Sequence, residues 1–164
     1  MTEYQVFSEL TSDDNKLLLD TPALVTILVA GADGVIDEQE LNWAEKLTHI
    51  RSYARPKELN HYYEVVEAHF DTSLESFMKS LPKDQKTRET HISDKLKMLN
   101  HVLSCLDNRT AFRLYESFTS FAKHIAKASG GFLRFGSISK DEKKWIGLSM
   151  IDPIILEEED DESE

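Results

Sequence analysis

Apolar residues recur every three or four positions along almost the whole chain, and no segment alternates apolar and polar residues as a half-buried strand does. This spacing is the period of an α-helix with one apolar face to bury. The connections between the periodic segments are short, so neighbouring helices are expected to lie antiparallel. The sequence therefore predicts an all-α fold, a compact bundle of about seven helices.

The most apolar stretch runs from Pro22 to Ala32, and its first residues are apolar on nearly all sides. A helix that spans a membrane needs about 20 such residues, so this shorter segment is predicted to lie at the centre of the bundle. Thr21 is the expected N-cap and Pro22 the expected first residue of the helix.

The remaining helices are predicted from their apolar faces and from the prolines and glycines between them. Cys105 lies between two leucines of one of these helices and is expected to be a buried, inert thiol. An additional N-terminal turn is expected over residues 4–10. The predicted helices cover residues 37–55, 59–70, 74–81, 92–106, 111–125 and 140–151.

The charge of the chain is unevenly distributed. Its formal net charge is −11, and seven of the last eight residues, 157–164, are acidic. Such a block of like charges repels itself and is predicted to be a disordered tail, which leaves residues 1–156 as the folded domain. An acidic chain is repelled by nucleic acid and by anionic lipid, so neither is expected as a partner; a basic protein or a cation is.

The single cysteine and the absence of an apolar leader favour the cytoplasm, and no membrane insertion is expected. Phosphate-binding loops, nucleophile elbows and catalytic-triad signatures are also absent from the sequence. The chain is therefore expected not to be an enzyme.

Two segments of the chain repeat each other. Residues 30–43 and residues 126–145 both contain Ala, Ala, Gly, Ile, Glu and Trp in the same order, with an insertion of six residues in the second copy. Each copy combines the end of an apolar helix, a turn and the start of an amphipathic helix. This pattern predicts an internal pseudo-repeat with an approximate two-fold arrangement.

The motif Ala-x-Ala-Asp-Gly-x-Ile-Asp-x-x-Glu at residues 30–40, with its weaker copy at residues 126–142, resembles the tellurite-resistance TerB-like family over residues 20–151. The resemblance implies a small helical bacterial domain, linked to tellurite resistance and stress response, with no catalytic activity. It also implies that acidic residues of the two motifs bind a divalent cation, here Ca²⁺ or Zn²⁺. Serines replace the expected aspartates of the second copy at positions 129 and 139. The candidate ligands are Asp33, Asp37, Glu40 and Glu142.

The acidic residues also have a purely structural interpretation. Residues 37–40 and 139–142 both fit the capping box, in which the N-cap and the third helical residue satisfy each other's backbone N–H groups. Gly34 and Gly130 would then be helix C-caps. An EF-hand is not expected, because its first two ligand positions would be Val29 and Gly31, which offer no side-chain oxygen. Capping leaves Asp33 unexplained, so Asp33 distinguishes the two interpretations.

The insertion in the second copy carries a further candidate site. Phe132, Arg134 and Phe135 lie between glycines, and aromatic residues and arginine are enriched in protein-binding hot spots. These residues are predicted either to dock a protein partner or to fold back onto the core. A protein–protein interaction module that uses this loop and the acidic tail, without a metal, is therefore the alternative function.

Overall fold

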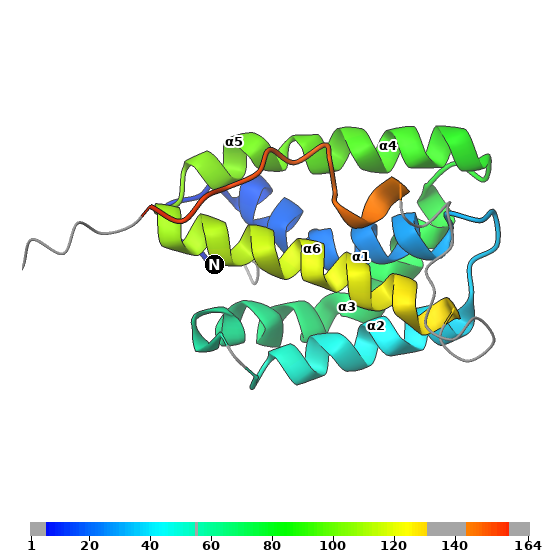
Figure 1. Cartoon of the computed structure of the whole chain (residues 1–164), viewed down its shortest axis with the longest axis horizontal. Coiled ribbons are helices and arrows are strands. Elements are labelled where there is room, and N and C mark those ends of the chain that lie inside the picture. The colour runs from blue at the N-terminus through cyan, green and yellow to red at the C-terminus, as the bar shows by residue number, and fades with distance from the viewer. Residues whose placement is uncertain (1–5, 55, 131–143, 158–164) are drawn as a thin grey trace, which may run out of the picture.

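The computed structural model describes residues 6–54, 56–130 and 144–157, and these form a helical bundle (Figure 1). No strand occurs among these residues, so the predicted all-α class is confirmed, with six α-helices where about seven were expected. The elements are α1 (Ser12–Ala30), α2 (Glu38–Arg51), the 3₁₀-helix η1 (Lys57–Leu59), α3 (Asn60–Ser80), α4 (Gln85–Lys97), α5 (Leu99–Ser104) and α6 (Asn108–Gly130).

Helix α1 is the central element of the bundle. Every residue from Leu18 to Ala30 is buried, which confirms the position predicted for this apolar segment. It contacts α2, α3, α4, α5 and α6. Figure 1 shows α4 and α5 on one side of α1 and α6, and α2 and α3 on the other. The apolar faces of all these helices therefore meet in one shared core.

The start of α1 differs from the prediction. The helix begins at Ser12, with Thr11 as its N-cap, and Pro22 lies inside it. A proline within a helix cannot donate to the carbonyl four residues earlier, here that of Leu18. The buried Tyr62 hydroxyl of α3 donates a hydrogen bond to this same carbonyl. A tertiary contact thus supplies the donor that the local sequence lacks, and the helix continues through the proline.

Three other helix boundaries also differ from the prediction. Helix α2 ends at Arg51, before the predicted end, and the Asn60 side chain donates to the Arg51 carbonyl at 3.0 Å. The predicted helices 59–70 and 74–81 form one helix, α3, in which Ser73 donates to Asp20 of α1 at 3.3 Å. The predicted helix 92–106 is divided at Met98 into α4 and α5.

The first residues of both copies of the pseudo-repeat lie at helix ends. The C-terminal ends of α1 and α6, where the copies begin, lie at the same end of the bundle (Figure 1). The C-cap of α1 is Gly31 rather than Gly34. Gly34 instead adopts a φ of +91°, a left-handed conformation that favours glycine, within the turn toward α2.

Beyond α6, residues 144–146 form a short helical turn. The buried Trp145 donates from Nε1 to Glu89 of α4 at 2.9 Å. The chain then turns at residues 149–151, and residues 152–157 run as an extended segment along α5 and the start of α6 (Figure 1).

Two asparagines hold this C-terminal segment through its backbone. Asn100 donates to the carbonyl of Met150 and accepts from the N–H of Asp152, at 3.0 and 2.7 Å. Asn108 donates to the carbonyl of Ile155 and accepts from the N–H of Glu157, at 3.0 and 2.8 Å. Each side-chain amide therefore pairs with the carbonyl and the N–H of residues two apart.

No helix in the described part of the chain has both the length and the apolar character of a membrane span.

Candidate functional site

The acidic residues of the first repeat stabilise the turn between α1 and α2. Asp33 is exposed, and its Oδ1 accepts a hydrogen bond from the Val35 N–H at 3.0 Å. Asp37 is the N-cap of α2 and accepts from the Gln39 N–H at 2.8 Å, so the capping role predicted for Asp37 is confirmed. Local hydrogen bonding thus accounts for Asp33 as well, which the sequence had left unexplained.

The structure does not gather these candidate ligands into a metal centre among the residues it describes. Glu40 is buried, with 1% of its surface exposed. Glu142, the fourth predicted ligand, lies outside the described residues. In residues 6–54, 56–130 and 144–157, no group of three or more His, Cys, Asp or Glu side chains is placed to hold a metal ion.

The other predicted partner-binding residues, Phe132, Arg134 and Phe135, also lie outside the described residues, as does the tail beyond Glu157. The prediction for Cys105 is wrong. Its thiol is exposed rather than buried, and Sγ lies 3.9 Å from Nε2 of His101, one turn earlier. The helix ends at Ser104, so Cys105 follows the last turn of α5 instead of facing the core.

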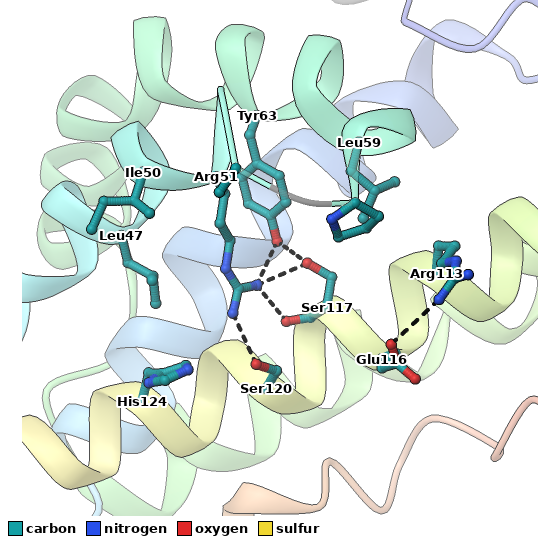
Figure 2. Close-up of a pocket in the computed structure, with 12 residues that line it drawn as sticks. Leu47, Ile50, Arg51, Leu59, Tyr63, Arg113, Glu116, Ser117, Ser120 and His124 are labelled. Carbon is teal, nitrogen blue, oxygen red and sulfur yellow. Dashed lines mark hydrogen bonds and ion pairs between the residues drawn. The ribbon is translucent and has the colours of Figure 1, made fainter.

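The structure reveals a different candidate site, a cavity of about 360 Å³ between α2, the start of α3 and α6 (Figure 2). One wall is apolar and comes from the second half of α2 and the connection to α3. It consists of Leu47, Ile50, Ala54, Pro56 and Leu59. The opposite wall is polar and comes mainly from α6.

Arg51, at the last turn of α2, lies at the centre of the polar wall. Its Nη1 donates to the Tyr63 hydroxyl and to the carbonyl and hydroxyl oxygens of Ser117, at 3.0, 2.7 and 2.8 Å. Its Nη2 donates to Ser120 at 3.0 Å. Its guanidinium carbon lies 5.2 Å from the centre of the Phe121 ring. Arg51 therefore joins α2 to α6 through neutral groups.

The guanidinium of Arg51 retains an edge without a partner. Within the described part of the chain, its Nε–H donates no hydrogen bond and its Nη2 makes only the bond to Ser120. Nε and Nη2 form the same edge of the planar group, and such an edge can donate to both oxygens of a carboxylate. In Figure 2 this edge faces away from Ser117.

The positive charge of Arg51 has no carboxylate partner among the described residues, whereas that of Arg113 does. Arg113, also in the cavity wall, lies 3.8 Å from a carboxylate oxygen of Glu116 and 4.0 Å from one of Glu58. A charged group that is half-buried without a counterion loses part of its hydration energy. Hydrogen bonds to neutral groups offset only part of that loss. Arg51 is therefore the uncompensated charge of the cavity.

The pKa of His124 is lowered at this site. Partial burial lowers the pKa of its imidazole, and the nearby positive charge of Arg51 lowers that pKa further, with smaller contributions from Lys127 and Lys123. The ordinary pKa of histidine is about 6.5, so His124 is neutral at pH 7. The site then contains one net positive centre at Arg51.

This site was missed in the sequence because its residues are far apart along the chain. Arg51 and Ser117 are separated by 66 positions. One signal was present: a polar stripe beside the apolar stripe of α6, with spacings of four, three and four residues. It consists of Arg113, Ser117, Ser120 and His124.

Comparisons with protein-family models, with curated proteins and with solved structures found no match to this chain.

Proposed function

We propose that the chain is a non-catalytic binding domain that holds an anionic group in the cavity beside Arg51. The observation that carries this proposal is the half-buried guanidinium, with neutral partners and a donor edge that remains available. An anion on this edge supplies both the missing charge and the missing acceptors. Apolar walls with a few polar groups that fix orientation are typical of ligand sites.

The polar groups of the cavity support binding rather than catalysis. Neither Ser117 nor Ser120 makes a hydrogen bond with His124 in the part of the chain that the structure describes. Ser117 is instead hydrogen-bonded to Arg51 and to the Tyr63 hydroxyl. The paired nucleophile and base of covalent catalysis are therefore not formed here.

Calorimetry with two probes, decanoate and inorganic phosphate, tests the proposal. At least one of these anions is expected to bind the full chain saturably with one-to-one stoichiometry. Arg51→Gln is expected to abolish that binding. Lys46→Gln, which removes one positive charge from an exposed position on the same helix, is expected to retain it. A folded wild-type protein that binds neither anion would show the proposal to be wrong.

The second candidate function is that of a TerB-like domain in a cytoplasmic bacterial tellurite-resistance or stress-response system, acting by binding Ca²⁺ or Zn²⁺. The observation that favours it is the helix–turn–helix over residues 30–40, which forms where the motif predicted it, with Glu40 buried at its second helix. Its predicted ligands are Asp33, Asp37 and Glu40 from the first motif, which do not form a metal centre among the described residues by themselves, and Glu142 from the second.

A thermal-shift experiment tests this second function. Ca²⁺ or Zn²⁺ is expected to raise the melting temperature of the wild type, and Asp33→Asn to abolish the rise. The asparagine keeps a side-chain oxygen for the Val35 N–H, so stability without the cation is expected to stay nearly unchanged. Asp13→Asn, at an exposed position of α1, is the control. Calorimetry that detects no cation binding to the wild type would remove this candidate.

A further inference from the structure

The cavity beside Arg51 has two walls of opposite character, and together they restrict the ligand. In Figure 2 the donor edge of Arg51 lies on the side of Leu47 and His124, which both line the cavity, and the apolar wall of the cavity comes from α2 and the connection to α3. A small inorganic anion would use only the polar wall and would leave the apolar wall in contact with water. A ligand with an anionic head and an apolar body uses both walls.

The charges around the cavity restrict the head group. Arg51 offers one uncompensated positive charge, since Arg113 lies beside Glu116 and Glu58. Because Glu116 and Glu58 already balance the charge of Arg113, a second negative charge on a ligand would find no second positive partner in the cavity. Neutral hydroxyl groups complete the polar wall. A monoanion matches this set of charges, and a phosphate dianion does not.

The shape of the donor edge distinguishes among monoanions. Two parallel N–H groups in the plane of a guanidinium match the two oxygens of a carboxylate, which lie in one plane at the same spacing. The cavity volume of about 360 Å³ lies near the lower end of the range of about 300–1,000 Å³ for ligand pockets. The ligand is therefore small.

We infer that the site binds a free monocarboxylic acid with a medium-length apolar chain, with its carboxylate on the Nε–Nη2 edge of Arg51 and its chain against the apolar wall of the cavity. This inference rests on the proposed function, because it names the class of ligand for the same cavity. It adds that the apolar wall contributes to affinity and that a single negative charge is preferred.

A series of probes tests the class of ligand. Acetate, hexanoate and decanoate are titrated into the full chain by calorimetry, beside decyl phosphate, decanol and a tetrapeptide with a free C-terminal leucine. Affinity is expected to rise with chain length by about fourfold for each added CH₂ group while the chain still fits. Decanoate is expected to bind at least tenfold more tightly than decyl phosphate, decanol or the peptide.

The outcomes separate this inference from the proposed function. Binding of phosphate or decyl phosphate at Arg51 without preference for decanoate would overturn the inference and leave the proposed function intact. Binding of decanol as tightly as decanoate would show that the site does not require a carboxylate. Tighter binding of the peptide would show that the ligand is a peptide C-terminus rather than a free acid. If no probe binds the folded chain, both proposals fail.

Variants locate the bound acid without relying on Arg51 alone, since its removal could also loosen α2 from α6. Arg51→Lys keeps the charge but loses the planar edge and is expected to weaken decanoate at least tenfold in a protein that circular dichroism shows to be folded. Ala54→Phe keeps Arg51 and fills the apolar wall, so it is expected to weaken decanoate more than acetate. Ala68→Phe, on the exposed face of α3, is the matched control and is expected to change neither affinity. Equal effects of Ala54→Phe on decanoate and acetate would overturn the placement of the chain.

Discussion

At the scale of single residues, the same side-chain types have different roles according to their neighbours. Arg113 lies beside two carboxylates, whereas Arg51 lies among hydroxyl groups, a carbonyl and aromatic rings. The sequence around Arg51 resembles the end of any exposed amphipathic helix, and its partners on α6 come from much later in the chain. Asp37 was predictable as an N-cap because capping depends on residues three apart at most. The candidate site was not predictable, since it depends on how α2 and α6 pack.

A first prediction concerns the imidazole of His124. Removing the positive charge with Arg51→Gln stabilises the protonated imidazole, so the pKa of His124 is expected to rise toward its ordinary value. The lowered pKa means that the unfolded chain binds this proton more readily, so His124 costs stability as the pH falls below about 6.5. The variant reduces that loss. Proton NMR titration of the histidine rings measures the pKa directly.

Lys46→Gln is the control for the loss of one charge. It is not among the groups that shift the pKa of His124 and is expected to leave that pKa unchanged. A pKa of His124 that is the same in the wild type and in Arg51→Gln would contradict the electrostatic description of the cavity.

At the scale of helices, the sequence predicted which segments are helical better than it predicted where they begin and end. The apolar run from Ala23 to Ala30 is helical and central as expected, because burial on all sides follows from composition alone. Pro22 was interpreted as the start of this helix, because proline favours the first turn. The true start lies ten residues earlier, since a hydroxyl from another helix replaces the missing N–H, and no local pattern encodes that contact.

The second prediction tests the replacement of that hydrogen bond. Tyr62→Phe removes the hydroxyl that donates to the Leu18 carbonyl and leaves this buried acceptor without its partner. The free energy of unfolding is expected to fall by about 1–3 kcal/mol, as measured by urea denaturation. In a Pro22→Ala background, the restored N–H at position 22 can donate to the same carbonyl. The cost of Tyr62→Phe is therefore expected to be smaller there.

Tyr53→Phe, which removes a hydroxyl from a side chain that is 63% exposed, is the control and is expected to be nearly neutral. Equal costs of Tyr62→Phe in the two backgrounds would show that the tyrosine does not substitute for the helical N–H of residue 22.

At the scale of the whole molecule, the predicted compact all-α bundle is confirmed, because the apolar faces of the helices share one core. The two repeat copies begin at one end of the bundle, at the C-terminal ends of α1 and α6. The C-terminal segment was not predictable, since Asn100 and Asn108 hold its backbone and no apolar pattern marks such contacts. The alternative function predicted from the sequence, a protein-interaction module, uses the acidic tail, which beyond Glu157 lies outside the described residues.

The third prediction separates this module from the cavity. Deletion of residues 158–164 is expected to leave the melting temperature unchanged, because it retains the hydrogen bond from Glu157 to Asn108. It is expected to weaken binding of a lysine-rich peptide, which fluorescence anisotropy measures, and wild-type binding is expected to weaken with added salt. Decanoate binding is expected to be unaffected. If neither this deletion nor Phe135→Ala changes the affinity for the peptide, the result would count against the interaction module.

The hydrogen bonds from the two asparagines to the backbone of residues 150–157 determine which substitutions this segment can accept. Asn100 and Asn108 bind this segment through its peptide groups, so they place no demand on an exposed side chain such as that of Pro153, whereas Ile151 is also fixed by its burial in the core. The backbone hydrogen bonds restrict two positions in another way. Asp152 and Glu157 must present an N–H to the asparagines, so neither can become proline, whereas Pro153 between them is tolerated because no asparagine takes its nitrogen.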